Sequence, residues 1–94
     1  MDMELKTLRS EIDSVDRQLI ELLEKRMDIA ARIAAWKAAA GIPTLDTGRE
    51  AEKLEAVRAL CRPETADLIA DVFQDVMAAS RTYQTSLRRD EHAG

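Results

Sequence analysis

The sequence predicts an all-α fold of three helices, one long, one short and one of intermediate length. Glycine and proline are scarce, with three and two copies among 94 residues, and runs of β-branched residues are absent. Apolar side chains in the N-terminal part recur every three or four residues, which is the spacing of one helix face. We expect a single domain over 1–94, with its core in 5–87 and a frayed tail in 88–94.

The first helix is expected to run from about Glu4 to Ala40, where Gly41 and Pro43 end it. Such a helix would be about 55 Å long, which exceeds the width of a compact domain of this size. Its apolar seam consists of Leu5, Leu8, Ile12, Val15, Leu19, Leu22, Ile29, Ile33 and Trp36. One chain cannot cover this seam, so we expect a second copy of the molecule to cover it.

Two shorter helices are expected after a short loop. The sequence Thr47-Gly-Arg-Glu50 matches a capping box, with Thr47 as N-cap, and predicts a helix to about Leu60. Pro63 and Glu64 suit the first turn of a third helix. The side chains expected to face inward are Ala51, Leu54 and Val57 on the second helix and Ile69, Phe73, Val76, Met77 and Leu87 on the third.

Composition argues against several functional classes. The pI near 5.0 and the presence of only three aromatic residues disfavour nucleic-acid binding. No apolar run reaches the roughly 20 residues that span a bilayer, and the charged N-terminus is unlike a secretory signal. The lone Cys61 fits a reducing cytoplasm, and the few Cys and His residues predict no metal site. We therefore expect a cytoplasmic protein without nucleic-acid or membrane partners.

Arg26 occupies a position of the apolar seam in the first helix. Burying an unpaired cation costs several kcal/mol, so Arg26 must meet an anion. Lys37 lies on about the same face, about 16 Å further along the helix axis. Two cations therefore look into one interior, in a chain whose net charge is −4. This combination indicates a buried pocket for a small anion.

Other polar residues join this pair. Ser80 and Gln84 lie four residues apart on the apolar face of the third helix, where apolar residues would be expected. Arg49 and Glu50 stand at the start of the second helix, and Arg9 is a basic residue beside the first seam leucines. Together these residues are the candidates for a binding or catalytic site.

Purely structural explanations remain open for these residues. Arg26 could pair with a carboxylate of a partner chain and fix the register of two helices. Lys37 could extend from the helix end into solvent. Glu50 could serve only as the capping-box acid, and Ser80 and Gln84 could form a satisfied polar pair in a helix interface.

Three segments together resemble the all-α class of chorismate mutase: LRSEIDSVDRQLIELLEKRMDIAARIAAWK, GIPTLDTGRE and FQDVMAASRTYQ. The resemblance covers roughly residues 5–87 and includes Asp-x-x-Arg-Glu at 46–50. It implies an intertwined homodimer of three-helix chains, with two sites that each draw on both subunits. The implied reaction is the Claisen rearrangement of chorismate to prephenate, an isomerase step of the shikimate pathway toward phenylalanine and tyrosine, without cofactor or metal.

The resemblance implies catalytic roles for four residues. Arg9 and Arg26 match the positions that bind the substrate's two carboxylates, with Arg9 reaching in from the other subunit. Lys37 and Gln84 match the pair that hydrogen-bonds the ether oxygen of the breaking bond. Along one helix Arg9 lies about 25 Å from Arg26, so an antiparallel partner must supply Arg9 if both belong to one site.

Four further residues take substrate-binding roles by the same resemblance. Glu50, with the backbone near Asp46, matches the group that holds the ring hydroxyl. Ser80 and Arg49 match supporting positions, on a carboxylate and beside the hydroxyl-binding group. The residue types suit the chemistry, because a pericyclic rearrangement needs positioning and fixed hydrogen-bond donors rather than a nucleophile, a proton transfer or a metal.

Three alternatives stay open at this point. The same scaffold could eliminate pyruvate from isochorismate or rearrange aminodeoxychorismate. Glu50 and the intact Asp-x-x-Arg-Glu stretch favour the ring hydroxyl of chorismate over these two. In a third alternative, the chain is a non-catalytic helical dimerisation module whose buried arginine fixes the register.

Overall fold

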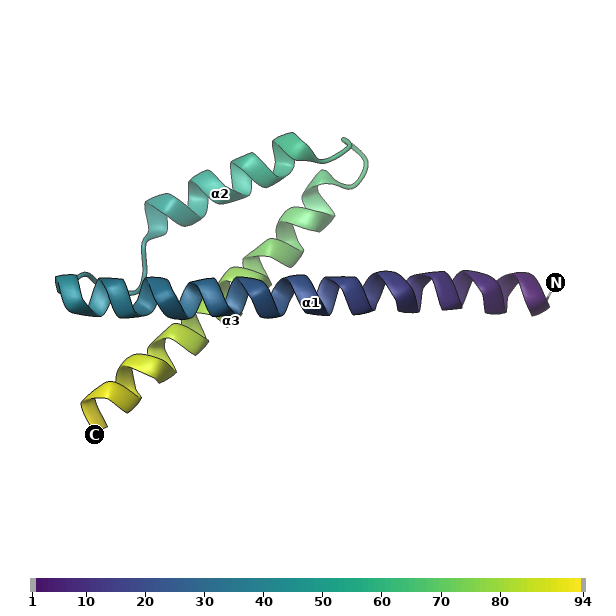
Figure 1. Cartoon of the computed structure of the whole chain (residues 1–94). Coiled ribbons are helices and arrows are strands. Elements are labelled where there is room, and N and C mark those ends of the chain that lie inside the picture. The colour runs from purple at the N-terminus through teal and green to yellow at the C-terminus, as the bar shows by residue number, and fades with distance from the viewer. Residues whose placement is uncertain (1, 94) are drawn as a thin grey trace.

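The computed structural model describes residues 2–93 of the chain, with the side chains of residues 3–88. It contains three helices, in the order α1 (Asp2–Ala40), α2 (Thr47–Leu60) and α3 (Ala66–Ala93). Figure 1 shows α1 as one continuous rod, α3 crossing it obliquely and α2 folded back beside α3. No strand occurs between residues 2 and 93, so the predicted all-α fold with three helices is confirmed.

The molecule is elongated because α1 is longer than the rest of the fold. Its principal extents are 57 × 31 × 14 Å and its Cα radius of gyration is 17.2 Å. A compact domain of this length would have a radius of gyration of about 12 Å. The helix α3 packs against both α1 and α2, and it therefore connects the other two helices.

The buried core is small and lies along α3, where the C-terminal half of α1 and the helix α2 pack against it. Its apolar members are Ala30, Ala34, Val57, Ala70 and Met77. Alanines four residues apart on α1 allow the two helices to approach closely. Of the side chains expected to face inward, Val57 and Met77 are buried, whereas Leu54, Phe73, Val76 and Leu87 are half-buried and Ala51 and Ile69 are exposed.

The N-terminal half of α1 is uncovered. Every residue from Met3 to Leu22 is exposed. The seam leucines, isoleucines, Val15 and Trp36 are between 44% and 66% exposed. This confirms that one chain cannot cover the seam, while its coverage by a second copy stays a prediction. None of the helices formed by residues 2–93 is long and apolar enough to cross a bilayer.

The C-terminal end of α1 agrees with the sequence prediction. Gly41 adopts φ +71°, its N–H donates to Ala38 O at 3.2 Å, and the N–H of Ile42 donates to Lys37 O at 2.8 Å. These two bonds form a Schellman motif, which requires a left-handed residue and so favours glycine. The motif turns the chain sharply at Gly41 and brings the following loop against the helix end.

The start of α2 differs from the prediction. The N-cap is Asp46 rather than Thr47, and Asp46 Oδ1 accepts a hydrogen bond from the N–H of Arg49 at 3.0 Å. A carboxylate is a stronger N-cap than a threonine hydroxyl and also neutralises the positive end of the helix dipole. The capping-box interpretation of Thr47 and Glu50 is therefore wrong, and Glu50 pairs elsewhere.

The bounds of the other helices also differ slightly. The helix α1 begins at Asp2 rather than Glu4. The helix α3 begins at Ala66, because Pro63 and Glu64 lie in a turn closed by a hydrogen bond from the N–H of Thr65 to Arg62 O at 3.1 Å. The backbone of α3 is helical to Ala93, and fraying of the segment 88–94 stays a prediction.

Candidate active site

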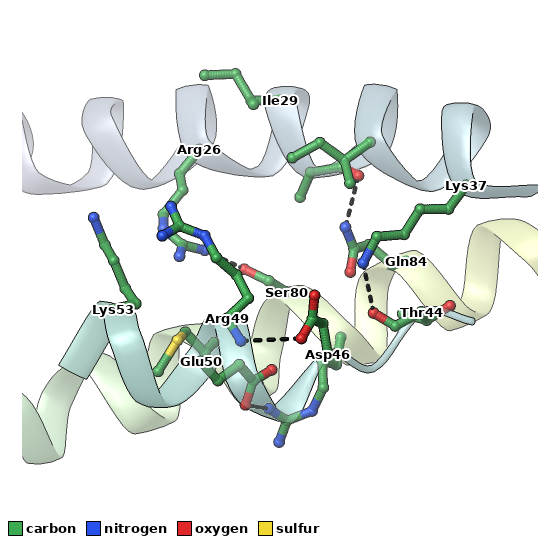
Figure 2. Close-up of a pocket in the computed structure, with 14 residues that line it drawn as sticks. Arg26, Ile29, Lys37, Thr44, Asp46, Arg49, Glu50, Lys53, Ser80 and Gln84 are labelled. Atoms are coloured by element: carbon green, nitrogen blue, oxygen red, sulfur yellow. Dashed lines mark hydrogen bonds and ion pairs between the residues drawn. The ribbon is translucent and has the colours of Figure 1, made fainter. Parts of the chain in front are cut away.

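A pocket of about 430 Å³ opens between the C-terminal half of α1, the start of α2 and the middle of α3 (Figure 2). The α1–α2 loop contributes Thr44 to its lining. The pocket brings together all but one of the residues that the sequence singled out: Arg26, Lys37, Asp46, Arg49, Glu50, Ser80 and Gln84. Residues separated by more than fifty positions in the chain thus meet in one place.

Arg26 is positioned by a serine on the neighbouring helix. Its Nη1 donates to Ser80 Oγ at 2.6 Å, and Ser80 Oγ in turn donates to Val76 O at 3.0 Å. Ser80 is 7% exposed, so its hydroxyl is held in one orientation. Within the part of the chain that the structure describes, no carboxylate pairs with Arg26. The remaining guanidinium N–H groups are therefore available to an anion in the pocket.

Lys37 folds back over the loop that follows its own helix. Its Nζ donates to Thr44 O at 3.0 Å, and the side chain is half-buried. Arg88 on α3 secures the same loop, since its Nη1 donates to Ile42 O at 2.8 Å and to Thr44 Oγ1 at 3.1 Å. Lys37 therefore does not extend into solvent, and two of its three N–H donors remain for a ligand.

Gln84 contributes a buried side-chain amide to the pocket. It is 8% exposed, and its Nε2 donates to Ala30 O at 2.9 Å. Because a carbonyl oxygen cannot face another carbonyl oxygen, this bond fixes which end of the amide is the NH₂ group. The second N–H of that group is then available to a ligand beside Lys37, which lines the same pocket.

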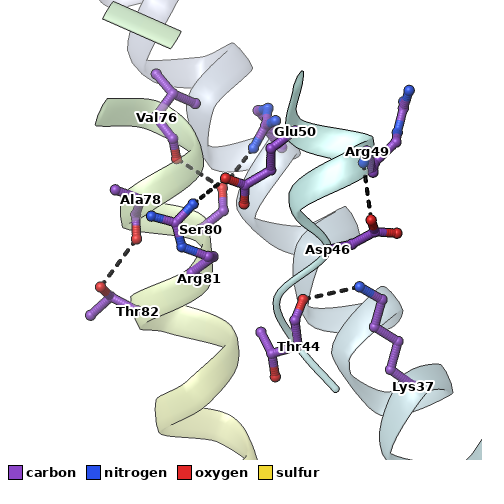
Figure 3. Close-up of polar contacts among 11 residues, drawn as sticks. Lys37, Thr44, Asp46, Arg49, Glu50, Val76, Ala78, Ser80, Arg81 and Thr82 are labelled. Atoms are coloured by element: carbon purple, nitrogen blue, oxygen red, sulfur yellow. Dashed lines mark hydrogen bonds and ion pairs between the residues drawn. The ribbon is translucent and has the colours of Figure 1, made fainter. Parts of the chain in front are cut away.

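Glu50 forms an ion pair with Arg81, which the sequence analysis had not singled out. Figure 3 shows the Glu50 carboxylate reaching from α2 to the guanidinium of Arg81 on α3. Arg81 lies four residues after the buried Met77 and three before Gln84, so the helical period of α3 could have placed it on the pocket face. Arg81 is one of several charged residues of α3, and nothing else in the sequence distinguishes it.

Lys53 is a second residue that the sequence analysis missed. It lies one turn after Glu50 on α2, and Figure 2 shows its side chain extending from α2 toward α1. Residues three apart share one face of a helix, so the position of Glu50 could have indicated that Lys53 lies on the pocket side of α2.

Arg9 does not line the pocket of its own chain. It lies in the exposed N-terminal half of α1, about 25 Å along the helix from Arg26. Its predicted contribution to a site on a partner subunit stays a prediction.

The pocket is cationic although the chain as a whole is acidic. Five basic and two acidic side chains line it, a formal charge of +3, against −4 for the whole chain. The basic side chains are Arg26, Lys37, Arg49, Lys53 and Arg81. Such a pocket favours a ligand with more than one negative charge. Among residues 2–93, no cluster of three His, Cys, Asp or Glu side chains could hold a metal ion.

The family model described as chorismate mutase type II matches residues 8–85. The T-protein of Haemophilus influenzae is 41% identical over 73 residues, which are 78% of this chain and 19% of that protein. The T-protein of Enterobacter agglomerans is 42% identical over 86 residues, or 87% of this chain and 22% of that protein. This chain thus spans about a fifth of the length of these two relatives.

A shorter match is to the 4-amino-4-deoxychorismate mutase of Streptomyces venezuelae. It is 39% identical over 46 residues, which are 49% of this chain and 45% of that protein. No solved structure matches the chain significantly.

Proposed function

The chain belongs to the type II chorismate mutase family, and from this premise we propose that it is an isomerase that converts chorismate to prephenate. The observation that carries the proposal is the pocket. It gathers Arg26, Lys37 and Gln84, with donors left free, inside a cationic lining. Chorismate is a dianion, and its rearrangement belongs to the biosynthesis of phenylalanine and tyrosine.

The two substrate carboxylates are bound by arginines in this proposal. Arg26 provides a guanidinium whose planar fork matches a carboxylate, and the hydrogen bond to Ser80 Oγ fixes its direction. Arg9 of a second subunit binds the other carboxylate. Holding both ends of the substrate places the enolpyruvyl arm over the ring, in a conformer close to the transition state.

Lys37 and Gln84 act on the ether oxygen. Negative charge develops on this oxygen as the C–O bond lengthens, and fixed N–H donors stabilise it without having to reorganise. Both side chains are already held by backbone carbonyls, Lys37 by Thr44 O and Gln84 by Ala30 O. No proton needs to move, and no covalent intermediate is formed.

The ring hydroxyl is bound at the α2 side of the pocket. Glu50 accepts the hydrogen bond of the hydroxyl, the backbone near Asp46 lies on the same side, and Arg49, the residue before Glu50, also lines the pocket. The ion pair with Arg81 supports this role, because it keeps the Glu50 side chain directed along the α2–α3 interface.

We propose a homodimer with two shared sites. The uncovered face from Met3 to Leu22 supports it, since an antiparallel second copy would bury this apolar seam. The same arrangement would bring Arg9 to the partner's pocket. A cytoplasmic location is proposed on the single cysteine of the sequence, which fits a reducing compartment.

Incubation of the purified protein with chorismate tests the activity. We expect chorismate to disappear and prephenate to appear, with the product identified by chromatography and NMR because the two compounds are isomers. Arg26→Ala should lose this turnover, whereas Arg32→Ala, which removes an equal charge from an exposed position of α1, should retain it. Absence of turnover in the folded wild-type protein would favour the non-catalytic dimerisation module.

A second candidate substrate is 4-amino-4-deoxychorismate, because the relative from Streptomyces venezuelae carries that activity in its name. The same incubation, with each substrate in turn, separates the candidates by their products. Isochorismate would release pyruvate if the chain were a lyase, and this can be detected directly.

A further inference from the structure

Both carboxylates that line the pocket already have partners within the chain. Glu50 Oε1 accepts a hydrogen bond from Arg81 Nη1 within their ion pair, and Asp46 Oδ1 accepts one from the N–H of Arg49 at 3.0 Å. The second of these bonds belongs to the N-cap of α2. Glu50 is therefore the pocket carboxylate whose charge is offset by a side-chain cation, while Asp46 is engaged in capping α2.

The Glu50–Arg81 pair is partly shielded from solvent. The Glu50 side chain is 26% exposed and the Arg81 side chain 35% exposed, and both line the pocket between α2 and α3. Charges in such a position are screened less by salt than charges at an open surface. The Arg81 guanidinium therefore makes the electrostatic potential more positive at a ligand group beside Glu50.

We propose that Arg81 is a specificity-determining residue, which makes the Glu50 side of the pocket select a neutral hydroxyl over an ammonium group. The inference rests on the proposed function. A carboxylate accepts a hydrogen bond from either group, and an unpaired carboxylate attracts an ammonium more strongly because of its charge. Arg81 neutralises that attraction and adds repulsion, while leaving a lone pair of Glu50 free for a neutral O–H donor.

The charge of the whole pocket supports the same selection. With five basic and two acidic side chains, the lining favours a ligand that carries two negative charges. An amino group in place of the ring hydroxyl is protonated near neutral pH and reduces the net charge of the ligand to −1. Removing Arg81 should weaken both the local and the overall preference, and Glu50 would then be free to pair with the ammonium.

The test compares kcat/KM for chorismate and for 4-amino-4-deoxychorismate. Wild-type protein should prefer chorismate, and Arg81→Gln, which retains an N–H donor toward Glu50 without the charge, should shift the ratio toward the amino compound by about tenfold. Arg81→Lys, which retains the charge, should keep the wild-type ratio. The competitive inhibition constant of the amino compound against chorismate gives a second measure of the same preference.

A matched control is available on the same pair of helices. Arg58 on α2 pairs with Asp67 on α3 at 3.5 Å and with Glu55 at 3.0 Å, and it does not line the pocket. Arg58→Gln therefore removes the same charge and a similar link between α2 and α3. Its specificity ratio should equal that of the wild type.

The outcomes separate the two proposals. If wild-type protein converts chorismate but Arg81→Gln lowers both kcat/KM values equally, Arg81 only links the helices and this inference is wrong, while the proposed function stands. If folded wild-type protein converts neither compound, the proposed function fails and the inference fails with it. Should Arg81→Gln not fold, as judged by its circular dichroism, Arg81→Leu carries the comparison, with the same ratio shift expected. If neither neutral variant folds, Arg81 is required for the fold and the specificity role is rejected.

Discussion

Ser80 illustrates how one buried hydroxyl directs a charged group. It donates to Val76 O and accepts from Arg26 Nη1, so a single side chain links the backbone of α3 to the guanidinium on α1. A serine on an apolar helix face is otherwise unfavourable, because its hydroxyl must find partners. Here the hydrogen bonds of Ser80 to Val76 O and from Arg26 fix the direction of the Arg26 guanidinium.

Arg26→Ala should nearly abolish turnover and leave the protein folded. Losing a charge-assisted contact to a substrate carboxylate costs about 2–5 kcal/mol, which corresponds to roughly thirty- to several-thousand-fold in kcat/KM. Stability should hold or rise, because Arg26 has no carboxylate partner among the described residues. Steady-state kinetics and thermal melts measure both effects. A variant that unfolds, but whose folded fraction keeps full activity, would instead support a role in fixing the register.

Gln84→Glu should make the reaction depend on acid. At neutral pH the introduced carboxylate would face both Ala30 O and the ether oxygen, and it would repel the negative charge that develops there. Only the protonated form can donate, so kcat/KM should rise as pH falls through the pKa of the introduced carboxyl. The protonated carboxyl group has one O–H donor, whereas the amide has two N–H donors. The kcat/KM of the variant in acid should therefore stay below the wild-type value. A pH–rate profile equal to that of the wild type would remove Gln84 from the ether-oxygen role.

At the scale of elements, the α1–α2 loop determines where Lys37 lies. The Schellman motif at Gly41 turns the chain back, Thr44 O holds the ammonium, and Arg88 ties the loop to α3. Five hydrogen bonds thus connect the end of α1, the loop and α3. The lysine is positioned by the loop rather than by its own helix alone.

Arg88→Ala should loosen this loop without touching the pocket lining. Arg88 does not line the pocket, so its loss should act through the freedom of Thr44 and Lys37. We expect kcat/KM to fall by about three- to tenfold. A hydrogen bond from a charged donor contributes about 1.5–3 kcal/mol to stability, and only part of this free energy should affect the position of Lys37. Arg62→Ala, an exposed arginine in the α2–α3 connection, is the control and should behave as the wild type. Equal kinetics for both variants would show that the loop keeps its position without Arg88.

The sequence predicted those site residues that break an apolar period. Arg26, Ser80 and Gln84 each stand where a helix face should be apolar, and burial forces such groups to be satisfied. Glu50 was predicted for the site through the family resemblance and was also interpreted as the acid of a capping box. The second interpretation was wrong because Asp46, one position before the predicted cap Thr47, is the N-cap. Arg81 was missed because its partner lies 31 positions away on another helix, and sequence spacing carries no record of such a contact.

At the scale of the whole molecule, the shared-site proposal can be tested by complementation. Arg9→Ala and Arg26→Ala should each be nearly inactive as homodimers. In a heterodimer of the two, one site combines the intact Arg26 of one chain with the intact Arg9 of the other, and the second site carries both lesions. Random pairing makes about half of the dimers heterodimers, so activity should recover to about one quarter of wild type per site.

The two variants must be co-expressed or refolded together, because intertwined chains would not exchange between folded dimers. Heterodimers can be verified by separate affinity tags on the two chains. If Arg9 served its own chain, every site in the mixture would carry one lesion. No activity would then return, and the shared-site proposal would be defeated.

The small core has a consequence for how the protein folds. Among the side chains that the structure describes, the buried apolar ones are Ala30, Ala34, Val57, Ala70 and Met77. Ordering the backbone alone costs about 1–2 kcal/mol per residue in conformational entropy. Such a core cannot offset that cost, so folding should be a bimolecular reaction in which two unfolded chains order each other. Mass action then makes the melting temperature rise with protein concentration, as in obligate dimers. A dilution series followed by circular dichroism would measure this slope, and a melting temperature that does not change over a hundredfold dilution would mean that the single chain folds alone.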